Sequence, residues 1–482
     1  MMIEQNQLIR IDDYLWEIPK TTRENMRVPA SIFAVEELIG SLTEDRTLDQ
    51  LINVATLPGI RKTAIVMPDG HEGYGFPIGG VAATDMNRGV ISPGGIGYDI
   101  NCGVRLLTSS MSYLDIKDKI GALTHELSRM IPKGVGRGGS ITLSPKEMDK
   151  VLLQGAGWAV SRGYGFSEDL QHIESGGRLE NADPAMVSER AKNRGNDQLG
   201  TIGAGNHFVE IDRVERIYDH ETARVFGLFP DQVTILIHTG SRGLGHQVAT
   251  DYLKIFLSAM PSYGLHLPDR ELASAPFTST EGQNYFEAMS AAANFAWCNR
   301  EVISWEARKS WETIIKEPRE RLRLLYDVAH NIAKIEKHHI GGSPSKVIVH
   351  RKGATRAFGP GREEIPEDFG KVGQPVLIPG SMGTHSYVLA GNTESMDRSF
   401  GSTCHGAGRR MSRTAAKKAV DAPSLKKALQ ANDIEVEAGS YAGLAEEAPM
   451  AYKDVDLVVE TVHRAKLARR VAKLRPIGVI KG

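Results

Sequence analysis

The sequence predicts an α+β protein with a sheet-based core and surrounding helices. Short apolar runs that end beside glycine- or histidine-bearing loops indicate buried strands, and longer segments with helical spacing lie between them. These segments do not alternate in the regular rhythm of βαβ units, which favours α+β over α/β. The polar loops of interest are spread from Asp69 to Lys481. We therefore expect one composite domain over residues 1–482 rather than separable modules.

The strand predictions rest on four apolar runs, at residues 64–67, 233–237, 346–349 and 387–390. Helices are predicted over residues 147–154, 287–308, 318–338 and 424–432, and a further one is expected to start near Ser412. The helix over 318–338 is supported by an apolar stripe at helical spacing: Leu324, Leu325, Val328, Ala329 and Ile332.

The composition is that of a globular protein with enough length for a large core: 482 residues, 41% hydrophobic and 24% charged. Lys and Arg total 58 and Asp and Glu total 59, which gives a net charge of −1. Because there is no overall positive field, any binding of nucleic acid depends on a local basic face. The N-terminal MMIEQNQLIR lacks the pattern of a secretory signal, and no stretch of about 18 apolar residues predicts a membrane span.

The chain has three cysteines, Cys102, Cys298 and Cys404. An odd and sparse set is not a disulfide framework, so we expect a cytoplasmic protein with free thiols. Cys102 would then be available as a thiolate ligand.

Glycine is abundant and clustered. Fifty glycines are present, and clusters occur at residues 70–80, 94–103, 134–139, 203–205, 240–245, 380–383 and 401–408. Ordinary turns explain any single cluster, but most of these also carry His, Asp, Ser or Arg. The pattern indicates loops where the backbone comes close to a ligand.

Five residues have the chemistry of ligands for a borderline divalent ion: Asp99, Cys102, His207, His238 and His330. Asp99 and Cys102 share one glycine-rich loop, although a capping Asp beside a small buried Cys is the commoner reason for such a pair. His238 closes a predicted strand, and His330 lies near the apolar stripe of a predicted helix. Either histidine alone is more often a core residue than a ligand.

The segment 206–210 reads as the start of a strand. Alternation would place Asn206, Phe208 and Glu210 on one side and His207 on the other.

His405 is a candidate nucleophile because small residues surround it in the segment STCHGAGRR. Histidine can form a covalent phosphoramidate, the amides of Gly406–Gly408 could cradle an anion, and Arg409 could bind a phosphate. The alternative is a plain turn in which His405 is a general base or packs. A second small-residue loop, PGSMGTHS from Pro379, suits phosphate oxygens but is not a P-loop. In the predicted turn at 68–71, Asp69 could touch metal or substrate, or make an Asx-turn.

Two basic sets are candidates for contact with an RNA backbone, although such sets are usually solvated helix faces. The first is Arg409, Arg410, Arg413, Lys417 and Lys418, and the second is His463, Arg464, Lys466, Arg469, Arg470, Lys473 and Arg475.

Taken together, these segments resemble the RtcB family of 3′-phosphate RNA ligases. The resemblance covers nearly the whole chain and is carried by long stretches: MPDGHEGYGFPIGG from Met67, PGGIGYDINCGVRLL from Pro93, GAGNHFVE from Gly203, IHTGSRGLGHQV from Ile237, YDVAHN from Tyr326, HRKGATRAF from His350, LIPGSMGTHSYVL from Leu377, STCHGAGR from Ser402, YKDV from Tyr452, and Lys481. It implies the RtcB-type fold.

The resemblance also implies the chemistry. Asp99, Cys102 and His207 would hold one Mn²⁺, and Cys102, His238 and His330 a second. His405 would attack the α-phosphate of GTP, and the GMP would pass to an RNA 3′-phosphate before the 5′-hydroxyl end displaces it. A 2′,3′-cyclic phosphate would first be opened. The residues implied to surround the guanylate are Asn206, His207, Phe208, Val209, Glu210, His330, Asn331, Pro379, Gly380, Ser381, Met382, Ser386, His405, Gly406, Ala407, Gly408, Arg409 and Lys481.

The implied partners are tRNA halves and broken RNA ends, with an archease-type activating protein, and we expect a monomer. Two other functions fit the same residues. A dinuclear metallophosphoesterase would hydrolyse cyclic phosphate ends without GTP and leave His405 unmodified. An RNA-binding protein with a structural metal would have a closed metal site and would tolerate the loss of His405.

Overall fold

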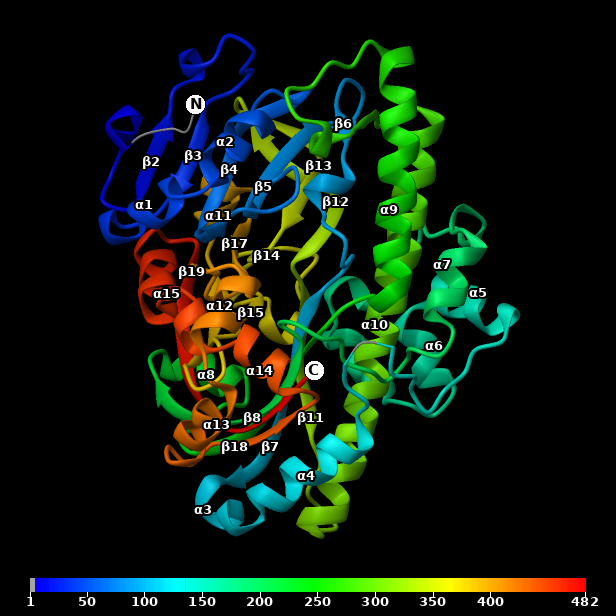
Figure 1. The fold of residues 1–482 in the computed structure, drawn as a ribbon, viewed down its shortest axis with the longest axis vertical. Coiled ribbons are helices and arrows are strands. Elements are labelled where there is room, and N and C mark those ends of the chain that lie inside the picture. The colour runs from blue at the N-terminus through cyan, green and yellow to red at the C-terminus, as the bar shows by residue number, and fades with distance from the viewer. Residues whose placement is uncertain (1–4, 135) are drawn as a thin grey trace.

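Two β-sheets form the core, and the long helix α10 (Thr280–Ile315) contacts strands of both (Figure 1). The computed structural model describes residues 5–134 and 136–482. The first four residues of the N-terminal segment, and Val135 in the glycine cluster 134–139, lie outside the described residues. The predicted α+β class with a sheet-based core is confirmed.

The first sheet has seven strands in the order β1-β2-β3-β4-β5-β13-β12, and only β3 and β4 pair in parallel. Its strands are β1 (Ile9–Arg10), β2 (Leu15–Ile18), β3 (Ala30–Phe33), β4 (Ile60–His71), β5 (Ile78–Asp85), β12 (Asn331–Ile340) and β13 (Ser343–Lys352).

The second sheet has eight strands in the order β11-β7-β9-β8-β19-β16-β15, with β18 paired in parallel to β19 and all other pairs antiparallel. Its strands are β7 (Gly103–Ser112), β8 (Phe208–Ile217), β9 (Gln232–Thr239), β11 (Arg323–Ala329), β15 (Pro375–Ile378), β16 (Ser386–Gly391), β18 (Glu435–Ala438) and β19 (Ala468–Lys481).

Two small strand pairs complete the β-structure. β6 (Val90–Ile91) pairs with β10 (Ala275–Pro276), and β14 (Ala354–Arg356) pairs with β17 (Ser402–Cys404). The second pair matters for the site, because β17 ends at the residue before His405.

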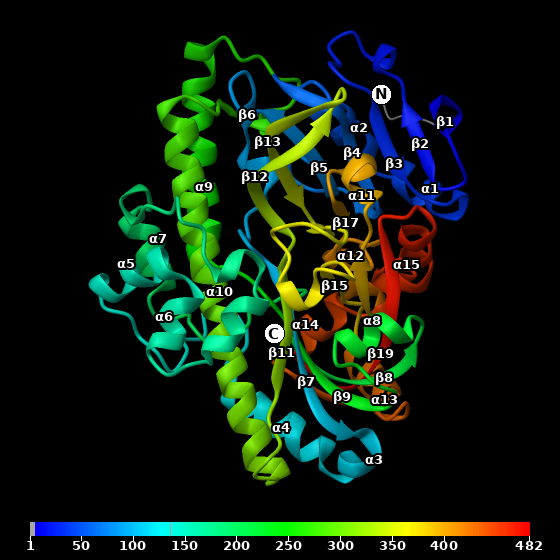
Figure 2. The same cartoon turned by 180° about the vertical axis from the view of Figure 1, so that it is seen from behind.

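Helices surround the sheets, with α5, α6 and α7 on the outer side of α10 in both views (Figures 1 and 2). Besides α10 they are α1 (Glu36–Thr43), α2 (Thr47–Val54), α3 (Tyr113–Ile116), α4 (Ile120–Met130), α5 (Pro145–Gln154), α6 (Ala156–Ser161), α7 (Glu189–Gly195), α8 (His220–Val225), α9 (Arg242–Ala259), α11 (Ser395–Ser399), α12 (Arg413–Ala419), α13 (Ala422–Gln430), α14 (Tyr441–Glu446) and α15 (Val455–Arg464). Among the described residues, no helix combines the length and apolar character that crossing a membrane requires.

The four predicted strands are confirmed within β4, β9, β13 and β16, and the predicted helices at 147–154, 287–308, 424–432 and near Ser412 correspond to α5, α10, α13 and α12. The prediction of a helix over 318–338 is wrong. This segment forms β11 and β12, which meet at His330. Strand β11 and the first residues of β12 are buried, and their closely spaced apolar residues imitate a helical stripe.

The predicted turn at 68–71 is also wrong, because these residues form the irregular end of strand β4. The pairing register with β5 shifts between Val66 and His71, which is the signature of a bulge.

Arg300 on α10 ties the helix to three segments of the second sheet. Its guanidinium donates to both carboxylate oxygens of Asp327, at 2.8 and 2.9 Å, and to the carbonyl oxygens of Asn101 and Thr239, at 2.8 and 2.9 Å. Arg105 donates to the same Asp327 carboxylate at 2.8 Å. All three charged side chains are fully buried, so each depends on the others for its pairing.

We expect Arg300→Met to lower the free energy of unfolding by about 3–5 kcal/mol, because it removes one partner of a buried ion pair and leaves two carbonyls unpaired. Urea titration followed by circular dichroism measures this. Lys309→Met, at an exposed position of the same helix, is the matched control. Equal stability of the two variants would contradict the anchoring role of Arg300.

Candidate active site

The register of the second sheet gathers the predicted ligands at one end. Cys102 precedes β7, whose first residues pair with the end of β9, so that Val104 lies opposite His238. His238 also lies opposite Phe208, the first residue of β8, which follows His207. The last residue of β11 pairs with Gly103, and His330 comes next. Residues far apart in the sequence therefore meet because antiparallel pairing aligns their strand ends.

Cys102 lies at the centre of two groups that could each hold a metal ion. Its Sγ lies 3.4 Å from His207 Nε2 and 3.3 Å from His238 Nε2. His207 Nε2 lies 2.9 Å from an Asp99 oxygen, and His238 Nε2 lies 3.3 Å from His330 Nε2. The two groups are Asp99, Cys102 and His207, and Cys102, His238 and His330. The structure thus brings all five predicted ligands together.

The chemistry of these groups fits divalent ions. Donor atoms about 3 Å apart can share one ion, because metal–ligand bonds of about 2.0–2.3 Å bring ligands that close. The pKa values of His238 and His330 lie well below the ordinary value, mainly because both rings are buried and also because other histidines lie nearby. Both rings are therefore neutral and can each offer a nitrogen lone pair to a metal ion. Burial raises the pKa of Asp99, but the contact with His207 outweighs it and brings that pKa to about 2.

Burial and the nearby Asp99 raise the pKa of the Cys102 thiol well above its ordinary value. An ion bound at this sulfur would reverse that shift, because metal coordination deprotonates a thiol outright. Carboxylate, imidazole and thiolate together suit zinc, manganese, iron or cobalt.

His405 is held by the buried carboxylate of Asp69 on β4. The Oδ2 atom of Asp69 lies 2.6 Å from His405 Nδ1 and accepts from the backbone N–H groups of His405 and Gly406, at 3.0 and 3.3 Å. A carboxylate accepts only, so Nδ1 carries the proton and Nε2 keeps its lone pair. Asp69 therefore orients His405, a role that differs from the contact with metal or substrate and from the Asx-turn considered from the sequence.

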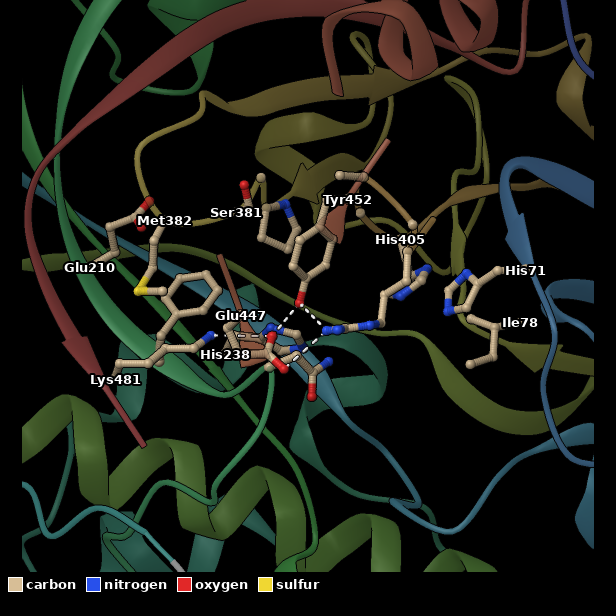
Figure 3. Close-up of a pocket in the computed structure, with 18 of the residues that line it drawn as sticks. His71, Ile78, Glu210, His238, Ser381, Met382, His405, Glu447, Tyr452 and Lys481 are labelled. Carbon is tan, nitrogen blue, oxygen red and sulfur yellow. Dashed lines mark hydrogen bonds and ion pairs between the residues drawn. The ribbon is translucent and has the colours of Figure 1, made fainter. Parts of the chain in front are cut away.

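A pocket extends from His405 to Glu210 and Lys481 (Figure 3). Its lining includes most of the residues expected around a guanylate: Asn206, Phe208, Glu210, Pro379, Gly380, Ser381, Met382, His405, Gly406, Ala407, Gly408, Arg409 and Lys481. Strand β8 begins at Phe208 rather than at the predicted Asn206, so the predicted alternation does not extend to Asn206 and His207, and both line a second hollow beside the metal groups. Within β8, Phe208 and Glu210 both line the pocket, as alternation predicts. Burial, with Asp212 beside it, raises the pKa of Glu210 well above its ordinary value.

The remaining residues of that set have other positions. Ser386 Oγ lies 3.4 Å from a Glu210 oxygen, directly behind the pocket wall. His207, His330 and Asn331 line the second hollow, which also includes Asn206 and His405. Val209 is fully buried on the opposite side of β8 from Phe208 and Glu210.

Most cations of both basic sets are paired with carboxylates. Much of the second set is neutralised, since Arg464 and Arg470 bind Glu460, Arg469 binds Asp219, and Lys473 binds Asp456. In the first set Arg409, Arg413 and Lys417 face Glu446 and Glu447 at the edge of the pocket.

Glu447 is a site residue that the sequence did not indicate. It is buried, and its carboxylate lies 3.1 Å from Arg409 Nη1 and 3.7 Å from Lys481 Nζ. It therefore holds both cations at the pocket. The sequence could not single it out, because Glu446 and Glu447 are adjacent and no motif shows which of the two is buried.

Comparisons with known proteins agree on one family. Residues 50–482 match the sequence model of a family described as "tRNA-splicing ligase RtcB". Among curated proteins, the "tRNA-splicing ligase RtcB" of Thermococcus kodakarensis is 54% identical over 483 residues, covering 100% of both chains. Those of Archaeoglobus fulgidus and Aeropyrum pernix are 52% and 53% identical over 477 residues, covering 98% of this chain and 99% of each relative.

We expect Cys102→Ala to lose both metal ions together, because the same sulfur belongs to both ligand groups. Metal content after loading with MnCl₂ and desalting is measured by mass spectrometry, with Cys298→Ala as the control at a buried cysteine outside the site. Retention of one full equivalent of metal by Cys102→Ala would contradict a shared thiolate.

Proposed function

This chain belongs to the RtcB family of tRNA-splicing ligases, and we propose that it joins RNA 3′-phosphate or 2′,3′-cyclic phosphate ends to 5′-hydroxyl ends by way of GMP bound covalently to His405. The observation that carries the proposal is the Asp69–His405 pair, which leaves one imidazole nitrogen as a nucleophile. His405 lines both the pocket and the hollow beside the metal groups, so that nitrogen lies where nucleotide and metal would meet.

In the first step, Nε2 of His405 attacks the α-phosphorus of GTP. The N–P bond forms as the bond from the α-phosphorus to the bridging oxygen breaks, and pyrophosphate leaves. The imidazole gains positive charge because Nδ1 keeps its proton. The Asp69 carboxylate, 2.6 Å away and fully buried, stabilises that charge.

The pocket offers matching groups for the nucleotide. The α-phosphate would lie against the backbone of Gly406–Gly408, where small residues permit a close approach. At the far end lies the carboxyl group of Glu210, which accepts from the Ser386 hydroxyl behind it. Even in its neutral form this group keeps a carbonyl oxygen, which suits an N–H donor on the edge of guanine. Buried acceptors discriminate strongly against a base that lacks that donor.

The proposed metal is Mn²⁺, one ion held by Asp99, Cys102 and His207 and the other by Cys102, His238 and His330. When bound, the ions would supply neutralisation of phosphate charge as the nucleophile arrives.

The later steps transfer GMP to RNA and then release it. Water opens a cyclic phosphate end to a 3′-phosphate. An oxygen of that phosphate attacks the phosphorus on His405, the N–P bond breaks, and the RNA ends in a diphosphate linked to guanosine. The 5′-hydroxyl then attacks the RNA 3′-phosphorus, forms the phosphodiester, loses its proton and expels GMP.

We expect His405→Ala to form no GMP adduct while keeping its fold and metal content, because the nucleophile is lost but no metal-group residue changes. Intact mass after incubation with GTP and MnCl₂, followed by peptide mapping, measures this against wild type and the exposed-site control His220→Ala. Uptake of labelled GMP by metal-loaded His405→Ala would contradict the assignment of His405 as the nucleophile. A wild-type protein that carries metal but gains no GMP would point to a phosphoesterase or to a required activating protein.

We expect Asp69→Asn to slow adduct formation by roughly 100-fold or more, as when a histidine loses the carboxylate that orients it. The single-turnover rate of GMP transfer to His405 is the measurement, with Asp118→Asn, an exposed site, as control. An unchanged rate in Asp69→Asn with intact metal content would show that the carboxylate does not support the nucleophile.

A further inference from the structure

Three aromatic rings line the hollow beside the metal groups, and the proposed mechanism uses none of them. Tyr98 and His246 are stacked, with ring centroids 4.9 Å apart and an angle of 24° between the ring planes. Tyr74 meets Tyr98 edge-on at 5.4 Å. All three rings line the hollow that contains Asp99, Cys102 and His207. Together Tyr74, Tyr98 and His246 form what we call the aromatic ledge.

The ledge is fixed in place beside the reaction site. Tyr98 directly precedes the candidate ligand Asp99, and Tyr74 supports its ring. His246 lies on α9 and is the outermost of the three, since it is exposed while Tyr74 and Tyr98 are half-buried. Burial, followed by the nearby Arg194, lowers the pKa of His246, so its ring is uncharged at neutral pH. The uncharged ring of His246 is therefore the part of the stack exposed to solvent, in the same hollow as the candidate metal ligands.

The hollow continues into a basic trough. Ala204 belongs to the lining of both, and Arg242, which lines the hollow, donates from Nη2 to the Gly134 carbonyl in the trough at 3.4 Å. The trough walls are rich in glycine, with Gly134, Gly205, Gly439, Gly443 and Gly482. Such walls let a polymer backbone lie close to the protein.

The trough also carries unpaired positive charge. Lys133 and Arg137 line it, and within the described ranges 5–134 and 136–482 neither forms an ion pair with an acidic side chain. By contrast, the other trough cations Arg129 and Lys417 are paired with Glu126 and Glu446. The Lys133 ammonium donates to the carbonyl and hydroxyl oxygens of Ser128, which hold it at the trough without neutralising its charge. Cations without acidic partners along a groove, next to an exposed aromatic ring, are the combination that binds single-stranded nucleic acid.

On the basis of the proposed function, we infer that the terminal nucleobase of one RNA end stacks on His246 and that its sugar-phosphate chain leaves across Ala204 into the trough. Stacking uses the flat face that every base has, so this contact positions an end without reading its sequence. The terminal phosphate or hydroxyl then lies at the metal groups, because the ledge and the ligands share one hollow.

The test compares RNA binding by His246→Ala, His246→Phe and wild type, loaded with MnCl₂ and without GTP. The probes are fluorescent single-stranded RNAs with either a 3′-phosphate or a 5′-hydroxyl end, each with an intact or an abasic terminal nucleotide. We expect His246→Ala to weaken binding of an intact end about tenfold and to leave binding of the abasic end unchanged. His246→Phe keeps an aromatic face and should bind like wild type.

The matched control is His266→Ala, at an exposed histidine outside the hollow, which should match wild type. If His246→Ala weakens binding of only the 3′-phosphate RNA, or of only the 5′-hydroxyl RNA, the result supports the inference and shows which RNA end binds at the aromatic ledge and the trough. The inference would be overturned if His246→Ala weakened binding of intact and abasic ends equally, because the contact would then not involve the terminal base. It would also be overturned if His246→Phe bound as weakly as His246→Ala, because an aromatic face alone would then not account for binding.

Failure of the stacking inference can be distinguished from failure of the proposed function. Formation of the His405 adduct is measured without RNA, and binding of RNA ends is measured without GTP. A protein that forms the adduct and binds RNA, but is indifferent to His246, overturns the ledge alone. A protein that forms no adduct but binds RNA ends through His246 bears on the proposed His405 chemistry alone and leaves the ledge supported.

Discussion

The buried guanidinium of Arg300 is the interaction on which the site geometry depends. It reaches from α10 to the carbonyl of Asn101, one residue before Cys102, and to the carbonyl of Thr239, one residue after His238. It also holds Asp327, on the strand that leads to His330. A buried charge cannot shift without losing partners that nothing else replaces. One side chain therefore fixes the relative positions of three segments that carry candidate ligands.

The two sheets contribute different parts of the site. The second sheet carries the metal groups at its strand ends, whereas Asp69 comes from β4 of the first sheet. His330 is the single residue between β11 and β12, which belong to different sheets. Its ring lies 4.9 Å from that of His405, so the junction also sets the spacing between the candidate metal ligands and the proposed nucleophile. The site thus depends on how the sheets pack as well as on each sheet alone.

The sequence predicted the fold class and the strands that have a clear apolar run, because burial dictates that pattern. It failed at residues 318–338, where β11 and the start of β12 are buried without alternation, so their apolar residues could be taken for a helical stripe. The five metal-ligating candidates could be named from residue type, but their grouping depends on strand register, which no local pattern encodes. The role of Asp69 was left open for the same reason, since its partner His405 lies 336 positions away. Glu447 was missed because its burial arises only when α14 packs against α12, α13 and β18 and brings it beside Arg409 and Lys481.

The order of the strands in the second sheet has a consequence for how the molecule forms. β19, from residues 468–481, lies between β8 and β16 and completes the pairing of a strand made more than 250 residues earlier. Pairing over so long a separation is slow, because loop closure precedes any gain from contacts. Until β19 inserts, β8 presents an open edge of unpaired backbone N–H and C=O groups, which invites pairing with other chains. Self-association during folding is thus a built-in hazard of the same topology that brings Lys481 beside Phe208 in the finished site.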